Sequence, residues 1–306
     1  MRPLFVDCPP FLEQLYREGL SDIVPELEIH VGDPAGDDLV RLCAGRSHIL
    51  NDHSRFTAEI LERCQDLRCI VFLGTGAGSF IDLDAARRLD ITVRSYKGYG
   101  DRSVAEHAFA LMLAAAHRVA EMDRDVRAGL FQPKNSVELL GKTVGVIGTG
   151  GIGGEMVRLC AGIGMKVLAW NRSGVPGDLP CEAVALDELL RRSDVVSVHL
   201  ALNEGTRGLL DRDKLALLKP GAIFVNTARG AIVDEAALVD ALREGRIAHA
   251  ALDVFTEEPL PAESPLRTLS NTTLTPHAGF MTREASVNLL RMALEILVEE
   301  LALERR

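Results

Sequence analysis

A glycine-rich turn gives the clearest chemical signal in the chain, K-T-V-G-V-I-G-T-G-G-I-G-G-E-M over Lys142–Met156. It carries the pattern G-x-G-x-x-G between an apolar run and a helical stretch, the setting of a dinucleotide-binding turn. Gly148 would permit the tight turn, Gly150 would let the backbone approach a pyrophosphate, and Gly153 would let the helix pack close to the strand. Free N–H groups at the helix N-terminus would hold the phosphates. Without a ligand the same turn would only join a strand to a helix; with one, contacts are expected at Gly148, Gly150, Gly151, Ile152 and Gly153.

The next apolar run ends in V-L-A-W-N-R-S over residues 167–173, and this ending bears on which dinucleotide would bind. NAD-preferring turns place a carboxylate about 20 residues after the glycines, where it accepts hydrogen bonds from ribose hydroxyls. Here that place is held by Asn171, which does not repel the extra phosphate of NADP. Arg172 and Ser173 would bind that phosphate by charge-assisted and neutral hydrogen bonds. We expect NADP or NAD with NADP favoured; the alternative is a solvated turn in which Asn171 still bonds a ribose hydroxyl.

Composition excludes several classes of function. The 306 residues suggest about two domains, and 47 % apolar residues are enough for buried cores. A net charge of −10 argues against duplex nucleic acid and anionic membrane surfaces as partners. The N-terminus has too short an apolar stretch for a signal peptide, and no apolar run is long enough to span a bilayer. The six cysteines lack zinc spacing, so we expect no metal, reduced thiols and a cytoplasmic protein rather than three disulfides.

Short apolar runs alternate with helical patterns, which predicts βαβ units and parallel sheets in two α/β blocks joined near residue 100. The missing linker suggests closely docked domains with a ligand cleft between them. Strands are predicted at Leu4–Asp7, Glu28–Val31, His48–Leu50, Ile70–Leu73, Ile91–Arg94, Thr143–Ile147, Lys166–Trp170, Val195–Val198, Ala222–Asn226 and His249–Leu252. Helices are predicted at Phe11–Glu18, Thr57–Cys64, Leu83–Arg88, about Ser103–Gly129 and Glu284–Leu303, with others starting near Gly151, Leu186, Asp211 and Glu235.

Four further segments, together with the glycine turn, carry a family resemblance. They are S-V-A-E-H at Ser103–His107, N-T-A-R-G at Asn226–Gly230, A-L-D-V-F-T-E-E-P-L at Ala251–Leu260 and T-P-H-A-G-F at Thr275–Phe280. In their order and spacing, over nearly the whole chain, they resemble the D-isomer-specific 2-hydroxyacid dehydrogenases. These enzymes transfer hydride between a nicotinamide and a 2-hydroxy acid.

The resemblance implies two Rossmann-like or flavodoxin-like, doubly wound parallel-sheet domains with an active-site cleft between them. A substrate-binding domain would comprise residues 1–98 and 283–306, and a dinucleotide-binding domain residues 99–282. The long helix at 103–129 would link the domains and pack against its partner in a homodimer. Ordinary core packing is the alternative reading of its Ala/Leu-rich face.

The same resemblance implies a catalytic set of Arg229, Glu258 and His277. Arg229 follows a predicted strand, and its planar fork would hold the substrate carboxylate and polarise the carbonyl oxygen. His277 would give or take the hydroxyl proton. Glu258 would favour the imidazolium and fix its tautomer, while Glu257 beside it is solvated. Outside this family pattern, the arginine would be read as a surface charge and the histidine as structural.

The resemblance also implies contacts with the cofactor and the substrate. Further cofactor contacts are expected at Leu200, Thr227, Asp253 and Gly279, with Asp253 facing the nicotinamide amide. The segment L-G-T-G-A-G-S-F-I-D-L resembles the loop whose backbone N–H groups hold the substrate carboxylate, here at Thr75, Gly76 and Ala77. This loop is one residue longer than the common version, and Ser79-Phe80 replaces the usual Asp-Asn.

Several departures from related enzymes narrow the substrate. Formate-oxidising relatives carry Gln at Glu258, and phosphite-oxidising ones carry Lys about where Thr75 stands. Enzymes of 3-phosphoglycerate carry an Arg at Asn51, for which Arg55 would be the substitute if it is not a surface charge. We therefore favour a small, unphosphorylated 2-keto acid such as glyoxylate or hydroxypyruvate, with Phe280 either adding an apolar wall or filling core. The alternatives are a 3-phosphoglycerate dehydrogenase-like enzyme or a nucleotide-sensing corepressor-type binding protein of the same fold, for whose extra terminal segments 306 residues leave no room.

Overall fold

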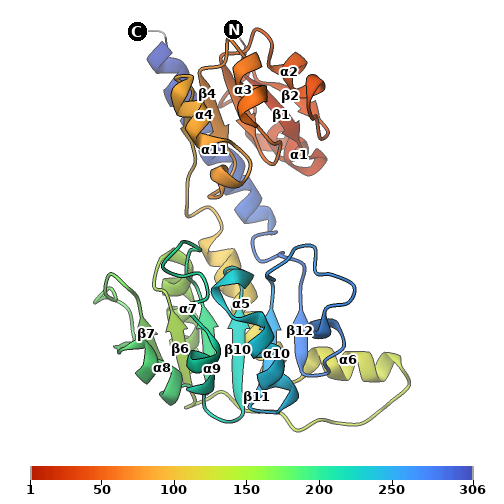
Figure 1. Cartoon of the computed structure of the whole chain (residues 1–306), viewed down its shortest axis with the longest axis vertical. Coiled ribbons are helices and arrows are strands. Elements are labelled where there is room, and N and C mark those ends of the chain that lie inside the picture. Colours follow the sequence, from red (N-terminus) through yellow and green to blue (C-terminus); the bar gives the residue numbers. More distant parts are fainter. Residues whose placement is uncertain (1, 305–306) are drawn as a thin grey trace. The chain divides into compact units, whose positions relative to one another are not determined.

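A computed structural model describes residues 2–304 of the chain, which divides into two units (Figure 1). The first unit comprises Met1–Gly100 and Thr282–Arg306, and the second comprises Asp101–Met281. Each unit contains one sheet, and every strand pairing within the described residues is parallel. The predicted fold class, two α/β domains with parallel sheets, is confirmed.

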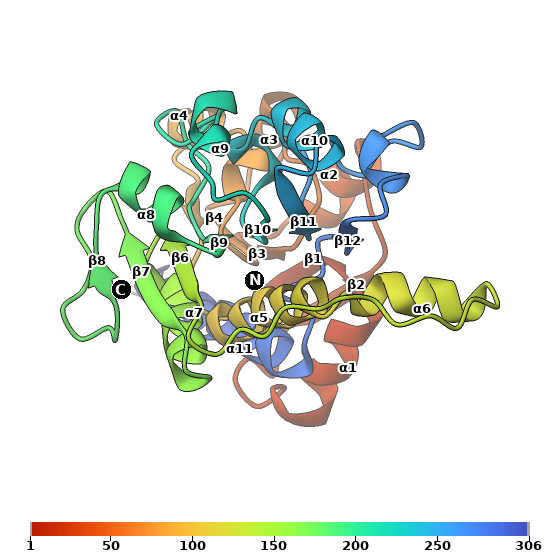
Figure 2. The same cartoon turned by 90° about the horizontal axis from the view of Figure 1, so that it is seen from below.

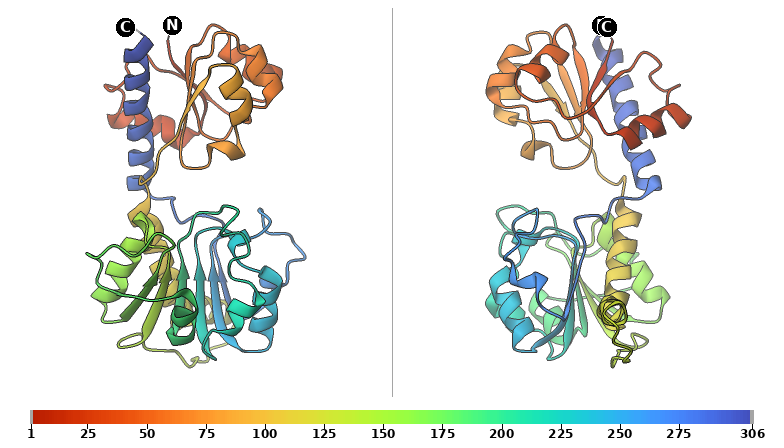
Figure 3. Two further views of the ribbon diagram at one scale, coloured as in Figure 1. Left: turned by 60° about the vertical axis from the view of Figure 1, so that its left-hand side comes forward. Right: turned by 90° about the vertical axis from the view of Figure 1, so that its right-hand side faces the viewer.

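The first unit is built on a five-stranded sheet of order β2-β1-β3-β4-β5. Its strands are β1 (Leu4–Cys8), β2 (Glu28–Val31), β3 (His48–Asn51), β4 (Cys69–Phe72) and β5 (Thr92–Arg94). Its helices are α1 (Pro10–Gly19), α2 (Asp37–Cys43), α3 (Ala58–Arg63), α4 (Leu83–Arg88) and α11 (Arg283–Glu304), with a 3₁₀ turn at Ala77–Ser79. Helices α1 and α11 cover one face, and α2, α3 and α4 cover the other (Figure 3).

Two cores in this unit follow from the alternation of side chains along its strands. Phe5 and Leu50 pack with α1 and α11, whereas Leu4, Val6 and Ile49 pack with the helices of the opposite face. Successive residues of a strand point to opposite faces, so a strand buried on both sides must be apolar at nearly every position. This explains why the strands read as continuous apolar runs.

The second unit is built on a seven-stranded sheet of order β12-β11-β10-β9-β6-β7-β8. Its strands are β6 (Thr143–Ile147), β7 (Lys166–Trp170), β8 (Glu182–Ala183), β9 (Val195–Val198), β10 (Ala222–Asn226), β11 (Ile247–Leu252) and β12 (Thr272–Leu274). Its helices are α5 (Asp101–Ala116), α6 (Val119–Arg127), α7 (Gly151–Gly162), α8 (Leu186–Arg192), α9 (Arg212–Ala216) and α10 (Glu235–Arg243). The chain order reverses between β6 and β9, and such a switch point is where open α/β sheets bind ligands, at the carboxyl ends of their strands.

The prediction of one helix over 103–129 was wrong. Helix α5 ends at Ala116, and Arg118 adopts a left-handed conformation with a φ of 53° before α6 begins. A left-handed residue interrupts the helical hydrogen-bond ladder and turns the chain. The Arg118 guanidinium then pairs with Glu121 at 2.7 Å in the first turn of α6. Helix α6 and the segment after it extend away from the sheet of the second unit (Figures 1 and 2).

Smaller differences concern short or polar elements. Strand β12 and helix α2 were not predicted from the apolar pattern. Strand β12 is only three residues long, and helix α2 carries Asp37 and Asp38 in its first turn. Strand β8 has only two residues, both exposed. Strand β4 begins and ends one residue earlier than predicted, and Ile91 lies outside β5. All are pieces too short for a periodic signal.

The six cysteines are free thiols. Burial is the largest influence on four of them: it raises the pKa of Cys8, Cys69 and Cys160 to about 12, and it also raises the pKa of Cys181. These thiols therefore stay protonated and pack as small apolar side chains. Across residues 2–304, none of the helices combines the length and the apolarity needed to cross a membrane.

Candidate active site

The glycine-rich turn closes β6 onto α7, and two of its glycines are required by the fold itself. Gly148 has a φ of +96°, and a Cβ there would lie 2.5 Å from the carbonyl oxygen of His199. A Cβ on Gly153 would lie 1.8 Å from the carbonyl oxygen of Gly148. A side chain at Gly153 would force the first turn of α7 away from the strand, and one at Gly148 would collide with the backbone that follows β9.

Gly150 is different, because nothing in the protein requires a glycine there. Its φ is −68°, which any residue can adopt, and no atom lies within 4 Å of the position that a Cβ would occupy. Gly150 is also the N-cap of α7, a helix without a side-chain cap, so the N–H groups of Gly151 and Ile152 begin the helix beside this open space. An open cradle beside free N–H groups fits a diphosphate.

Three buried polar atoms at the same edge of the sheet lack partners within residues 2–304: Thr149 Oγ1, His199 Nδ1 and Thr227 Oγ1. They follow β6, β9 and β10, which are neighbouring strands. Burial lowers the pKa of His199 to about 4, so the ring is neutral, and its Nε2 lies 2.8 Å from the hydroxyl of Ser197. Buried polar groups ordinarily find partners. These three atoms therefore fit a ligand rich in hydroxyl and amide groups, as a dinucleotide is.

The predicted ribose end of the site lies at the end of β7. The side-chain amide of Asn171 donates to the hydroxyl of Ser173 at 2.9 Å and to the carbonyl of Gly174 at 3.0 Å. These bonds close the turn and leave the amide oxygen as the group that can face a ribose. Arg172 is exposed, and its guanidinium lies beside Gly205. Within the described residues no carboxylate pairs with Arg172, so its charge is available to a ligand.

A histidine–carboxylate pair lies at the ends of β11 and β12. Nδ1 of His277 is 2.8 Å from Glu258 Oε2, and the other oxygen of Glu258 accepts from the backbone N–H of Phe255 at 2.9 Å. A carboxylate in such a pair can only accept, so Nδ1 carries the hydrogen. The pair therefore fixes the tautomer and leaves Nε2 as the ring nitrogen that can reach a substrate. Glu257 is exposed.

Asp253 holds the loop that carries this histidine. Its carboxylate is 1 % exposed and accepts from the N–H groups of Ala278 and Gly279, both at 2.9 Å, and from the hydroxyl of Thr275 at 2.5 Å. Burial alone would raise the pKa of Asp253, but His107 and these donors outweigh it and hold the pKa at about 2. The carboxylate is therefore ionised, and its bonds set the backbone on which the catalytic candidate sits.

The histidine itself adopts an unusual backbone conformation within that loop. His277 has a φ of 54°, and its N–H donates to the carbonyl of Asp253 at 2.8 Å. Left-handed conformations are uncommon for a residue with a Cβ and persist where surrounding bonds enforce them. The ring of Phe280 meets the imidazole edge-on, with centroids 6.3 Å apart.

Arg229 follows β10 with its guanidinium exposed. The Asn226 side chain forms the turn by accepting from Ala228 N at 3.0 Å and donating to the carbonyl of Arg229 at 3.1 Å. Arg229 Nη1 donates to the carbonyl of Ala228 at 2.6 Å. Among residues 2–304 no carboxylate pairs with this guanidinium, so its remaining donors can bind a carboxylate ligand.

Most candidates of the second unit thus share one edge of one sheet. Arg229 follows β10, Asp253 and Glu258 follow β11, and the loop of His277 and Gly279 follows β12, three adjacent strands. The glycine turn follows β6, and Leu200 follows β9 with a methyl group 2.9 Å from the Cβ position of Gly148. Carboxyl ends of parallel strands meet at one edge, which is how positions far apart in the sequence become one site.

Thr75, Gly76 and Ala77 lie in the first unit, after β4. Thr75 is exposed and Ala77 is buried, and the carbonyl of Ala77 accepts from Ile81 N at 2.8 Å. None of the three backbone N–H groups has a hydrogen-bond acceptor among the described residues. Consecutive free N–H groups of this kind form a concave site for an anion.

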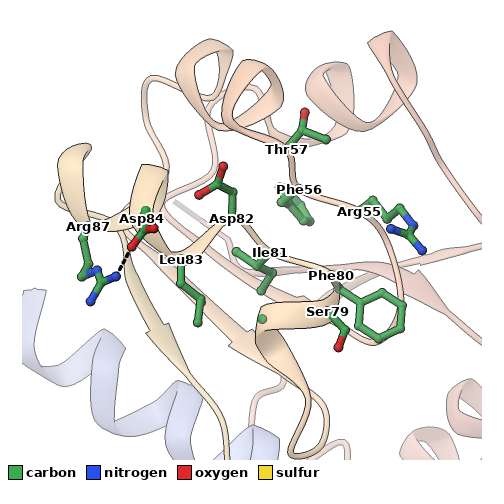
Figure 4. Close-up of a pocket in the computed structure, with 11 residues that line it drawn as sticks. Arg55, Phe56, Thr57, Ser79, Phe80, Ile81, Asp82, Leu83, Asp84 and Arg87 are labelled. Carbon is green, nitrogen blue, oxygen red and sulfur yellow. Dashed lines mark hydrogen bonds and ion pairs between the residues drawn. The ribbon is translucent and has the colours of Figure 1, made fainter. Parts of the chain in front are cut away.

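A pocket of about 560 Å³ lies beside this loop, between the starts of α3 and α4 (Figure 4). Arg55 and Phe80 lie at one end, and the Asp84–Arg87 ion pair lies at the other. Asn51 occupies the position at which enzymes of 3-phosphoglycerate carry an arginine. Its side chain is completely buried, and its amide donates to the carbonyl of Ser54 at 3.1 Å.

Thr149 and His199 were not predicted from the sequence, and neither was the role of Asp253 in holding the loop that carries His277. Thr149 and His199 each stand within two residues of the end of a predicted strand, so the rule about carboxyl ends of parallel strands was available to select them. The hydrogen bonds of Asp253 to Ala278 and Gly279 join residues that sequence spacing alone does not bring together.

The chain is similar to known proteins in sequence and in fold. A family model described as D-isomer specific 2-hydroxyacid dehydrogenase, NAD binding domain, matches residues 109–279. A glyoxylate reductase of Aeropyrum pernix is 42 % identical over 256 residues, 80 % of this chain and 76 % of that protein. A hydroxypyruvate reductase of Thermotoga maritima is 36 % identical over 277 residues, 89 % of this chain and 84 % of that protein.

Two further similarities concern a solved structure and a longer relative. The crystal structure of the TT0316 protein from Thermus thermophilus superposes with a TM-score of 0.86 at 35 % identity, covering 99 % of this chain and 97 % of that one. A D-3-phosphoglycerate dehydrogenase of Archaeoglobus fulgidus is 37 % identical over 268 residues, 86 % of this chain. The match spans only 51 % of that dehydrogenase, about half of its length.

Proposed function

The chain belongs to the D-isomer-specific 2-hydroxyacid dehydrogenase family and is an NAD(P)-dependent oxidoreductase, and on this premise we propose that it acts on a small, unphosphorylated 2-keto or D-2-hydroxy acid. Glyoxylate and hydroxypyruvate are the substrates that we favour. Relatives that carry these substrates in their names are 42 % and 36 % identical to the chain.

The observation that carries the proposal is the pair of His277 and Glu258, with Nδ1 and Oε2 2.8 Å apart. In the direction of reduction, His277 Nε2 gives its proton to the keto oxygen as the carbon beneath it becomes tetrahedral. A bound nicotinamide cofactor supplies the hydride that reaches C2. Glu258 stabilises the imidazolium before the transfer, and its own position is fixed by Phe255 N. The ring then regains its proton from solvent, and oxidation runs through the same groups in reverse.

Two sets of donors are proposed for the substrate carboxylate: the guanidinium of Arg229 in the second unit, and the backbone N–H groups of Thr75, Gly76 and Ala77 in the first. The guanidinium fork matches a carboxylate in two parallel hydrogen bonds and, next to the carbonyl, draws electrons from the oxygen that accepts the proton. Support comes from the free donors of Arg229 and from the unpartnered N–H groups after β4.

A phosphorylated substrate is disfavoured by the last residue of β3, Asn51. Asn51 is neutral and completely buried, and its amide is already bonded to Ser54. A phosphate at this place would find no cation at Asn51, and Arg55 lies at one end of the pocket shown in Figure 4. The edge-on packing of Phe280 against His277 gives the reaction centre an apolar wall.

We propose that NADP is favoured over NAD. Support comes from the exposed Arg172 and from the absence of a carboxylate at Asn171, which leaves nothing to repel the ribose phosphate. Asn171 still presents its amide oxygen to a ribose hydroxyl, so NAD binds as the weaker cofactor.

A homodimer is the proposed assembly, and α6 with the residues after it is the proposed contact. Val126, Leu130 and Phe131 are large apolar side chains with 55 %, 55 % and 92 % of their surface exposed. Contiguous exposed apolar side chains mark interaction surfaces. Sedimentation equilibrium should give twice the chain mass, and Phe131→Ser should shift the equilibrium toward monomer; a wild-type monomer at micromolar concentration would refute the dimer.

The catalytic proposal is tested by steady-state turnover of a 2-keto acid panel with NADH and with NADPH. We expect the highest kcat/KM for glyoxylate or hydroxypyruvate, and a higher value with NADPH. His277→Ala should lose about 10³-fold in kcat while its cofactor Kd stays within about twofold. An unchanged kcat in that variant, or preferred turnover of a phosphorylated acid, would overturn the assignment.

A further inference from the structure

A carboxylate from a neighbouring helix lies against the first turn of α7. Asp101 is the first residue of α5, which packs along α7. A Cβ on Gly151 would lie 1.7 Å from Oδ2 of Asp101 and 2.5 Å from its Cγ. The carboxylate therefore fills the space where the side chain of any other residue at Gly151 would begin, one residue beyond the open cradle of Gly150.

The N-terminus of α7 accounts for the presence of an anion there. The helix has 12 residues, no side-chain cap and no acidic residue of its own in the first turn. Its partial positive charge favours a negative group at this end, and Asp101 supplies one from α5. The diphosphate of a dinucleotide would approach the same helix end through the cradle of Gly150. Two anions would then share one positive helix end, and like charges repel.

The charged groups around Asp101 offer it no compensation. Arg102 on α5 bonds to Glu106 at 2.6 Å and to Glu155 on α7 at 3.0 Å. Arg158 on α7 also bonds to Glu155, at 2.8 Å. Among residues 2–304 no cation pairs with Asp101. Burial and, next, the charge of Glu155 raise the pKa of Asp101 above its ordinary value.

We propose that Asp101 couples dinucleotide binding to the uptake of a proton, so that the cofactor binds more tightly when this carboxyl group is neutral. The inference rests on the proposed function only in that the glycine turn binds a dinucleotide. The proton comes from the buffer and is bound by the carboxylate of Asp101 as the diphosphate arrives. Above the range in which Asp101 titrates, the carboxylate stays charged and weakens binding; as pH falls through that range, binding tightens.

Isothermal titration calorimetry of NADPH and NADH tests this without any turnover. Each cofactor is titrated at several pH values between about 5 and 7.5, each in two buffers that differ in ionisation enthalpy, because a bound proton then changes the apparent enthalpy. The ribose phosphate of NADPH titrates at about pH 6 and exchanges protons of its own, so NADH, which lacks it, isolates Asp101. Wild-type protein should show net proton uptake with NADH, and with NADPH it should take up more protons than Asp101→Asn does. Asp101→Asn should show no uptake with NADH, and at about pH 7.5 it should bind cofactor about tenfold more tightly than wild type.

Glu106→Gln is the matched control. It removes one acidic group from α5, as Asp101→Asn does, but Glu106 bonds to Arg102 and does not lie against the first turn of α7. It should bind cofactor and take up the proton as wild type does. With NADH, equal apparent enthalpies in the two buffers for wild type, or uptake that persists in Asp101→Asn, would overturn the inference and leave the proposed function standing. If neither cofactor binds at all, both fail together.

Discussion

The two units use the same device at their sheet edges, a buried aspartate that holds a loop by its backbone N–H groups. In the first unit Asp7, at the end of β1 and completely buried, accepts from the N–H groups of residues 52, 53 and 54 at 2.9, 2.7 and 2.6 Å. In the second unit Asp253 accepts from Ala278 and Gly279. In both, the carboxylate belongs to one strand end and the loop follows a neighbouring strand.

The difference lies in what each loop carries. Around Asp253 the polar groups all support the loop that presents His277, because His107 donates to Thr275 and Thr275 donates to Asp253. Around Asp7 the histidine is inside the network, since His53 bonds to Asp52 at 3.0 Å and to the exposed Asp33 at 2.6 Å. The same arrangement therefore positions the proposed catalytic histidine in one unit and binds two surface loops together in the other.

Between the two aspartate networks, the largest expected difference is in kcat when each buried aspartate is replaced by asparagine. Asp253→Asn loses an ionised acceptor and adds a donor where N–H groups already point, so the loop of His277 shifts. Because a misplacement of about 1 Å costs about 100-fold in rate, we expect kcat to fall by that factor. Asp7→Asn should change kcat by less than about threefold. Equal losses of kcat in the two variants would show that the comparison is wrong.

The strands of both sheets and the segments that carry the candidate site residues could be predicted from the sequence, whereas the two aspartate networks could not. The strands of the two sheets were predictable because each is buried on both faces and must be apolar. The glycine turn and the segments around Arg229, Glu258 and His277 stand out because their chemistry constrains residue type. Two parallel sheets were therefore expected, and two parallel sheets are found.

The aspartate networks could not be predicted, because hydrogen bonds between strand ends depend on register and loop conformation. Asp7 and Ser54 are 47 residues apart, and no local pattern links them. The break at Arg118 has a similar cause, since a left-handed residue other than glycine or asparagine leaves no compositional mark. The aspartates that hold these loops are thus the part of the structure that is hardest to predict from the sequence.

A second, smaller effect concerns stability in acid. The folded-state pKa of Asp253 is about 2, below its value of 3.8 in an unfolded chain. Its contribution of about 2 kcal/mol is therefore present above pH 4 and is lost as pH falls toward about 2. Urea unfolding of wild type should show this loss, and Asp253→Asn should be less stable near neutral pH but show a weaker decline in acid. A parallel decline in both proteins would contradict the assignment of this pKa.

The smallest effect should appear in the first unit and with the opposite sign. Burial alone would lower the pKa of His53, but its hydrogen bonds to Asp52 and Asp33, and then the charge of Asp7, raise it above the ordinary value. The stabilising charge on His53 is therefore fully present below the unfolded-state pKa, and it is lost as pH rises through the higher folded-state value. The thermal midpoint should drop by a few degrees over that interval.

His53→Gln should remove this dependence of the thermal midpoint on pH, whereas the exposed His117→Gln should keep it. Because the contribution of Asp253 is lost as pH falls and that of His53 is lost as pH rises, a single pH series on both variants separates the two networks. An unaltered loss of stability with rising pH in His53→Gln would mean that the histidine does not bind the two loops together.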